Sequence, residues 1–145
     1  MKNIWFDWNE EEHVAKCMIQ EVNNGPIFVG EAFCHPQDED MMSPRTGQEI
    51  AYKRAKIKQL QHMRNFEINP KLAALKHLYG CMVHSSRFNP ESYENCMLQR
   101  QIRFLEFDLT TVNEMIQYER ENLKAYIEDK DQMYKHIRKK REGQK

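Results

Sequence analysis

The segment from Ser85 to Pro90 carries side chains that are well suited to binding a nucleotide. It offers a guanidinium at Arg87, an aromatic face at Phe88 and hydroxyls, and Asn89-Pro90 is a typical helix start. Free backbone N–H groups at a helix start and an arginine bind phosphate, while an aromatic ring stacks on a base. The same composition is also typical of a plain connection between two helices, so both interpretations stay open.

Two further arginines lie on helical stretches where a ligand or a partner is within reach. Arg54 is flanked by Ile50 and Ala55, which puts it near the packed side of its helix. An arginine there either pairs with a carboxylate at the edge of the core or is held toward a ligand. Arg103 follows the apolar position Ile102, so it could reach across an interface between protomers. A site shared between two copies of the chain would fit this arrangement.

Patterns that would indicate catalysis or metal binding do not occur in the sequence. Cys81-x-x-His84 and Cys34-His35 are close Cys/His pairs, but a structural zinc site needs four converging ligands. The acidic residues 38–40 lack the spacing and turn glycine of a calcium loop, and we expect them to favour the start of the following helix. No nucleophile elbow, phosphate loop or dinucleotide fingerprint is found. We therefore expect a binding protein without catalytic residues, metal or cofactor, and not an enzyme.

An apolar stripe runs along the C-terminal part of the chain and requires another helix to cover it. Its positions recur at alternating steps of four and three, which is the heptad pattern of a coiled coil. Only Glu119 and Lys130 interrupt the apolar run. The stripe either pairs with a second copy of the chain, giving a homo-oligomer, or is covered by the chain's other helices. Its members are Leu98, Ile102, Leu105, Leu109, Val112, Ile116, Glu119, Leu123, Tyr126, Lys130, Met133 and Ile137.

The N-terminal residues 1–42 are predicted to form a β part. Asn24-Gly25 supplies two residues that adopt positive φ in a tight turn, so we expect an antiparallel hairpin of residues 13–22 with 26–34. Trp5, Phe6 and Trp8 form an earlier strand or cover one face. Because a lone hairpin is marginally stable in water, it must pack on a helix or pair with another copy.

Residues 43–145 are predicted to form a helical part, so the fold class is α+β with two medium helices and one long C-terminal helix. The long helix would be roughly 75 Å long at the usual rise per residue. Asp108 or Thr111 could cap a new helix, which leaves a kink near residue 110 open. The helix starts are Ser43-Pro44, Asn69-Pro70 and Asn89-Pro90, and the ends lie near Asn65, His84 and Lys140.

The charge is balanced overall but unevenly distributed. Residues 1–43 carry 2 Lys/Arg and 9 Asp/Glu, whereas residues 44–84 carry 8 and 2. These parts either neutralise each other across a fold or dimer, or the basic part binds an anionic ligand. The basic tail from Lys135 to Arg141 either stabilises its helix end or contacts a nucleic-acid backbone. Scattered cysteines and the lack of a long apolar stretch predict a cytoplasmic protein without membrane contact.

A resemblance to phage proteins is carried by residues 30–55. The pattern resembles one in small accessory proteins of phages that infect Firmicutes, and the larger layout is similar to the type 1 anti-Thoeris sponges. Those proteins have an N-terminal β part and long C-terminal helices, and they assemble as dimers or higher oligomers. The pattern reads Gly30-x-Ala32-x-Cys34-His35-Pro36-x-Asp38-x-Asp40, then Thr46-Gly47-x-x-Ile50-Ala51-x-x-Arg54-Ala55.

The resemblance implies a phage anti-defence function in the host cytoplasm. Proteins of that family sequester cyclic ADP-ribose signals of bacterial immunity without degrading them. By order and residue type, the resemblance implies a nucleotide held between helices by Arg54, Tyr79, Phe88, Asn89 and Arg103. Two alternatives remain open: a nucleic-acid-binding phage accessory protein that uses the basic segments, and a protein inhibitor of a host enzyme that docks through the acidic N-terminal part.

Overall fold

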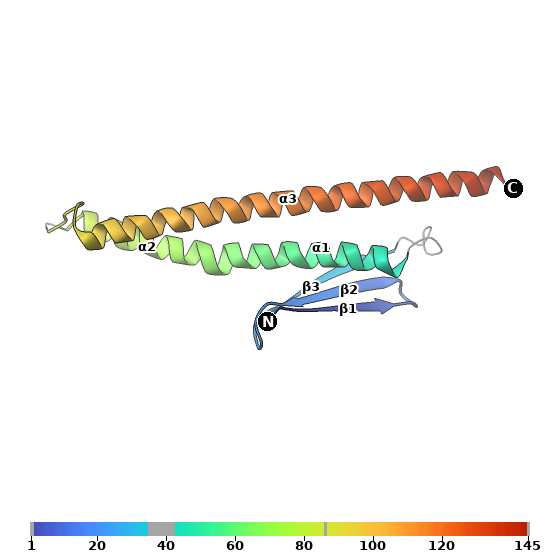
Figure 1. Ribbon diagram of the computed structural model, residues 1–145, viewed down its shortest axis with the longest axis horizontal. Coiled ribbons are helices and arrows are strands. Elements are labelled where there is room, and N and C mark those ends of the chain that lie inside the picture. Colours follow the sequence, from blue (N-terminus) through green and yellow to red (C-terminus); the bar gives the residue numbers. More distant parts are fainter. Residues whose placement is uncertain (1, 35–42, 86, 145) are drawn as a thin grey trace. The chain divides into compact units, whose positions relative to one another are not determined.

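The computed structural model describes residues 2–34, 43–85 and 87–144, which form a three-stranded sheet followed by helices (Figure 1). The α+β class is therefore confirmed. The acidic residues 38–40 and His35 lie outside the described residues. The strands are β1 (Asn3–Asn9), β2 (Val14–Gln20) and β3 (Ile27–Phe33), and the helical elements are α1 (Pro44–His62), the π-helical segment η2 (Met63–Ile68), α2 (Asn69–Val83) and α3 (Tyr93–Gly143).

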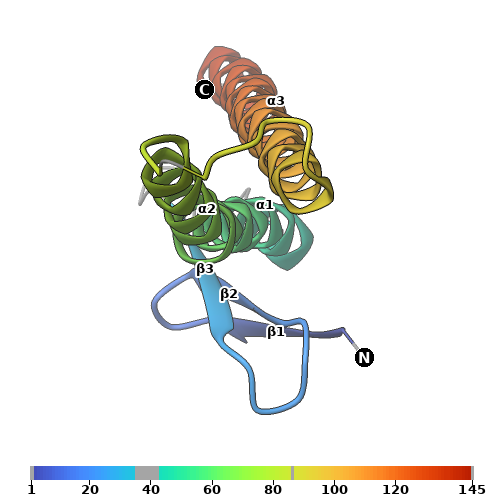
Figure 2. The same ribbon diagram turned by 90° about the vertical axis from the view of Figure 1, so that its left-hand side faces the viewer.

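The chain divides into two compact units, which we describe separately. The sheet unit comprises Met1–Gln59 and Gln117–Lys145, so it holds all three strands, most of α1 and the C-terminal part of α3. The turn unit comprises Leu60–Ile116, so it holds η2, α2 and the N-terminal part of α3 with the connection between them (Figure 2). Within the described residues, none of the helices carries an apolar stretch that could cross a bilayer.

The sheet is antiparallel with the strand order β1-β2-β3. The expected hairpin is confirmed, since β2 and β3 pair in the register Cys17↔Gly30, and β1 adds a further strand in the register Phe6↔Cys17. The expectation for the turn is wrong at Gly25, because Asn24 has a φ of 63° but no glycine has a positive φ. The connection spans residues 21–26 and closes through a 3.0 Å bond from the Gly25 N–H to the Val22 carbonyl, so it is no two-residue turn.

Small residues let α1 pack closely on the sheet. Ala15, Cys17 and Ala32 of the sheet are buried against Ala51 and Ala55 of α1. A Cβ atom on Gly30 would lie only 2.0 Å from the Ala51 carbonyl oxygen. The backbone of α1 therefore crosses directly over β3 at the one strand position without a side chain.

The two helices before the long connection are continuous rather than separate. As expected, α1 begins at Pro44, and the Ser43 hydroxyl caps it by accepting a 3.2 Å bond from the Thr46 N–H. The prediction of a fresh start at Asn69 is only partly right, because Asn69 is itself helical and its N–H bonds to the Arg64 carbonyl. The wider π turn of η2 admits Pro70, which has no N–H of its own, without breaking the helix.

The long helix α3 begins slightly later than predicted and is unbroken at residue 110. Its first turn is capped by Ser92, whose hydroxyl accepts a 3.3 Å bond from the Asn95 N–H. The Thr111 hydroxyl instead donates to the Phe107 carbonyl one turn back, so it supports the helix rather than capping a new one. No new helix therefore begins at this position.

Much of the heptad stripe is covered within this chain. In the turn unit, Val112 and Ile116 are buried with Leu60 and Ile68. Near the C-terminus, Met133 is 43% exposed whereas the following residue Tyr134 is buried. A straight α-helix drifts by about 20° per heptad, which explains why the buried stripe moves by one residue along α3.

Candidate functional site

An aromatic pair lies in the turn unit, where α2 ends and the connection to α3 begins. The rings of Tyr79 and Phe88 meet edge to face, with centroids 6.0 Å apart and planes at 77°. The Tyr79 hydroxyl accepts a 3.2 Å hydrogen bond from Nε2 of Gln99 on α3. Both rings are half-buried, so each is held by the protein and still has an accessible surface. The structure therefore brings two of the predicted site residues together.

Asn89, beside this pair, also organises the connection. Its Oδ1 accepts a 3.0 Å bond from the Glu91 N–H, and its carbonyl accepts a bond from the side chain of the buried Asn95. The preceding Arg87 is exposed, and its N–H bonds to the Ser85 hydroxyl at 3.3 Å. The hydrogen bonds of Asn89 and Arg87 thus hold the described part of this connection, and Arg87 is exposed to solvent.

Arg103 lies one helical turn after Gln99 on α3 and is exposed. Residues four apart share a face of a helix, so Arg103 lies on the same flank as the residue that holds Tyr79. On the next turn, Glu106 forms a 3.1 Å ion pair with Lys76 of α2. This ion pair and the Gln99–Tyr79 bond join α2 to α3 at positions before and after Arg103 in the sequence.

A largely apolar cavity of about 460 Å³ lies elsewhere between α2 and α3. It is lined by Lys71, Ala74, Leu75, Gln101, Phe104 and Leu105. The guanidinium of Arg100 lies 5.4 Å from the centroid of the Phe104 ring. This cation–π contact keeps an exposed aromatic ring and a positive charge together on α3.

Arg54 belongs to the sheet unit, unlike the other five predicted site residues. It donates a 2.7 Å hydrogen bond to the Glu31 carbonyl at the outer edge of β3. It also lines a cavity of about 140 Å³ with Lys130, Asp131 and Tyr134 of α3. The partners expected for Arg54 were a carboxylate or a ligand, and a backbone carbonyl was not among them. Since Arg54 lies in another unit, the structure does not place all six residues in one described site.

A cysteine–histidine contact on α2 also appears in the structure. The Cys81 Sγ lies 3.7 Å from Nε2 of His77, one helical turn away, and both residues are exposed. Within the part of the chain that is described, no group of three or more His, Cys, Asp or Glu side chains is arranged to hold a metal ion.

The sequence did not reveal two residues of this region. Gln99 has no periodic or motif signal, and only the fold shows that it reaches Tyr79. Phe104 lies off the heptad stripe, and an aromatic residue outside the buried face could have suggested a surface role. Comparison with protein-family models, curated proteins and solved structures gives no significant match.

Proposed function

We propose that this chain is a non-enzymatic binding protein that sequesters a small cyclic nucleotide of the cyclic ADP-ribose type without degrading it. The observation that carries the proposal is the Tyr79–Phe88 pair, whose tyrosine hydroxyl is held by Gln99. Arg87 directly precedes Phe88 in the chain, Arg103 lies one helical turn after Gln99 on α3, and both are exposed. A purine offers a face for stacking, and a pyrophosphate offers two negative charges for guanidinium groups.

Each residue then has a definite role. Phe88 or Tyr79 stacks on adenine, Asn89 hydrogen-bonds to the base or ribose, and Arg87 and Arg103 hold the phosphates. The side-chain Nδ2 of Asn89 takes no part in the turn bonds described above, so it can donate to a ligand. Arg54 enters the proposal through the family resemblance, as a residue that holds phosphate.

The chemistry of these side chains supports binding without hydrolysis. A guanidinium stays protonated, and amide and phenol groups do not accept protons near neutral pH. None of them is therefore a general base for attack on a glycosidic or phosphate bond. The resemblance to phage sponges supports the wider proposal that the bound nucleotide is an immune signal and that the protein acts in the host cytoplasm.

The experiment is isothermal titration calorimetry with several cyclic ADP-ribose isomers, followed by recovery of the nucleotide. We expect saturable binding of at least one isomer, and mass spectrometry of the heat-released ligand should give its unchanged mass. If none of the isomers binds at high micromolar concentration, sequestration of this ligand class is excluded. A changed mass would instead identify an enzyme.

Matched variants locate the binding site. Phe88→Ala and Arg103→Ala should each weaken binding about ten- to a hundredfold, since each removes a stacking or charge-assisted contact. Phe66→Ala and Arg120→Ala remove an exposed residue of the same type elsewhere and should leave the affinity unchanged. Equal losses in the two sets would show that the ligand does not bind beside Tyr79.

A further inference from the structure

The two edges of the sheet differ in how their backbone groups are satisfied. At the β3 edge, the carbonyls of Val29 and Glu31 accept 2.7 Å hydrogen bonds from the side chains of Lys58 and Arg54. Two cations of α1 thus occupy acceptors that an added strand would need. This edge is therefore closed to pairing with another chain.

The alternation of hydrogen bonds shows which groups of β1 face outward. The backbone carbonyls of Val29 and Glu31 point away from β2, so the backbone of the intervening Gly30 bonds to Cys17 of β2. The 3.1 Å bond from the Cys34 N–H to the His13 carbonyl follows the same alternation. The residues of β2 that alternate with those bonded to β3 then bond to β1. The pairing of β1 with β2 consequently leaves the backbone N–H and C=O groups at positions 4, 6 and 8 directed to the open edge.

The open edge of β1 is apolar and accessible. Ile4, Trp5 and Phe6 are 39%, 43% and 49% exposed, and the strand contains neither proline nor lysine, which commonly protect an edge. On the face that carries Phe6, the backbone of α1 lies over Gly30 of β3, two strands away from β1. Of the α1 side chains, Tyr52 reaches the Phe6 ring, with the ring centroids 6.5 Å apart.

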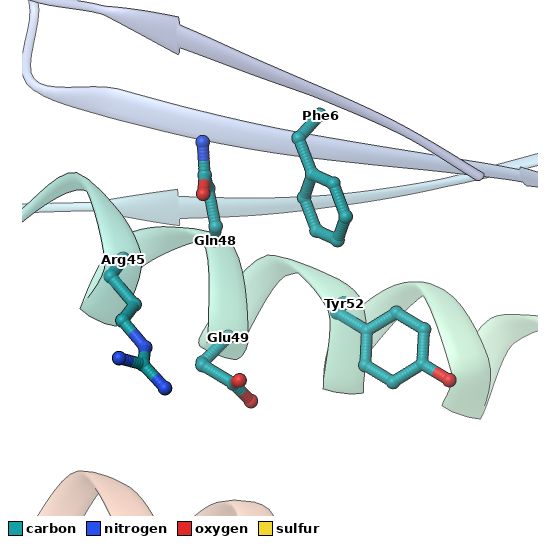
Figure 3. A pocket seen from close by; sticks show the side chains of 5 residues that line it. All are labelled: Phe6, Arg45, Gln48, Glu49 and Tyr52. Atoms are coloured by element: carbon teal, nitrogen blue, oxygen red, sulfur yellow. The ribbon is translucent and has the colours of Figure 1, made fainter.

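A cavity of about 360 Å³ lies beside Phe6 on the α1 side of the sheet (Figure 3). Arg45, Gln48, Glu49 and Tyr52 of α1 line it, and the Phe6 ring extends from the strand toward the helix in the same view. In an antiparallel pair, side chains directly opposite each other lie on the same face of the sheet. A residue placed opposite Phe6 on an added strand would therefore direct its side chain to the face of the sheet that carries the cavity.

The sequence of β1 matches an antiparallel copy of itself. If two such strands pair with Phe6 opposite Phe6, then Ile4 lies opposite Trp8, and Trp5 lies opposite Asp7. Asn3 lies opposite Asn9, and just beyond the strand Lys2 lies opposite Glu10. No like charges face each other, and each end gains an ion pair. This charge complementarity favours a second copy of the chain over an unrelated peptide.

We propose that β1 pairs antiparallel with β1 of a second copy, centred on Phe6, so that one continuous sheet spans two protomers. The Phe6 ring of each copy then packs at the cavity beside Tyr52 of the other. This interface is separate from the heptad stripe and does not rest on the proposed nucleotide binding. It gives the shared sheet a two-fold axis through the centre of the strand pair.

Sedimentation velocity over a range of concentrations tests the proposal, with Phe6→Lys as the disrupting variant and Phe33→Lys as its control. Phe33 is an equally large exposed residue, on the closed edge. We expect the unmodified protein and Phe33→Lys to sediment as dimers. Phe6→Lys should sediment as a monomer, and circular dichroism should show that it is folded. A monomeric unmodified protein at high micromolar concentration, or a Phe6→Lys dimer of unchanged affinity, would overturn the proposal.

Charge exchange provides a second test that does not disturb the strand. Lys2→Glu and Glu10→Lys should each weaken the dimer several-fold, because each places like charges opposite each other. The double variant restores opposite charges and should recover the dimer. If the two single effects simply add in the double variant, Lys2 and Glu10 do not face each other and the proposed register is wrong.

Crosslinking tests the register directly. In a variant with Cys34, Cys81 and Cys96 replaced by serine, Phe6→Cys should give a covalent dimer with a short bifunctional thiol reagent. Trp5→Cys should react far more slowly, because it lies opposite Asp7 rather than opposite itself. Equal crosslinking of the two variants would exclude pairing centred on Phe6, and capture of an unrelated extended peptide in place of a second copy would also overturn the proposal.

Discussion

Lys56 and Glu119 form an ion pair in the sheet unit, with the lysine Nζ 3.0 Å from the glutamate Oε1. Glu119 is the acidic residue that interrupts the heptad stripe of α3, and its side chain is only 12% exposed. The hydrogen bond to Glu119 raises the pKa of Lys56, and partial burial of the lysine opposes this rise. The interruption of the apolar stripe thus has a structural explanation, since α1 supplies its counter-charge.

Removing one partner of this pair should destabilise the fold by about 1–2 kcal/mol, between the values for exposed and fully buried pairs. Glu119→Gln leaves the half-buried ammonium of Lys56 without its carboxylate, so chemical denaturation should show a lower free energy of unfolding. Glu128→Gln changes an exposed residue on the same helix and serves as the control. Equal stability of the two variants would contradict a stabilising role of the pair.

The same pair predicts a dependence of stability on alkaline pH. Because folding raises the pKa of Lys56, the pair contributes fully below the unfolded value of about 10.5. Its contribution should decline as the pH rises through the higher folded pKa. The difference in unfolding free energy between the unmodified protein and Lys56→Met should therefore be constant from pH 7 to 9 and shrink above about pH 10.5. A difference that grows with pH would reverse the assigned sign.

Two glycines should respond in opposite ways to substitution by alanine. A Cβ on Gly30 would lie 2.0 Å from the Ala51 carbonyl oxygen and 2.5 Å from the Ala55 nitrogen, so α1 would have to move. We expect Gly30→Ala to cost about 2–3 kcal/mol or to prevent folding. Gly80 lies inside α2 with no atom near its potential Cβ, so Gly80→Ala should stabilise the protein by about 0.5–1 kcal/mol. Thermal denaturation of both variants checks this contrast.

Burial along α3 predicts a graded response to alanine. Ile116 is 2% exposed in the core of the turn unit, whereas Leu105 is half-buried and Phe107 is exposed. Ile116→Ala should cost about 2–4 kcal/mol, Leu105→Ala less, and Phe107→Ala close to nothing. Urea titration with a common slope measures the three values. A large loss for Phe107→Ala would indicate that another surface covers this residue in solution.

The elements with strong local signals were predictable from the sequence. The Ser43-Pro44 start follows from capping chemistry, and the stripe of α3 follows from its period. The two strands of the hairpin were predicted correctly, but the expected tight turn between them was not. The fusion of the two medium helices was not predictable in the same way. A proline after asparagine usually marks a helix start, and only the surrounding helix decides that a π turn holds it instead.

The candidate site was less predictable, because its contacts join residues that are distant in sequence. Tyr79 and Phe88 were expected near a ligand and do lie together, but Gln99, which holds Tyr79, has no signal in the sequence. Arg54 was expected to face a carboxylate or a ligand and instead bonds to a strand carbonyl. Backbone acceptors occur at every residue, so no sequence pattern indicates which of them an arginine will reach.

The four cysteines should differ strongly in their reaction with a thiol reagent at pH 8. Cys17 is fully buried between β2 and α1, and burial raises the pKa of its thiol, so the reactive thiolate is scarce there. Cys81 and Cys96 are exposed and should be modified first, Cys34 is half-buried and should follow, and Cys17 should react only after denaturation. Cys17→Ser identifies the slowest phase by removing it. Rapid modification of Cys17 in the native protein would mean that α1 separates readily from the sheet, and the close packing over Gly30 could not then be a stable part of the fold.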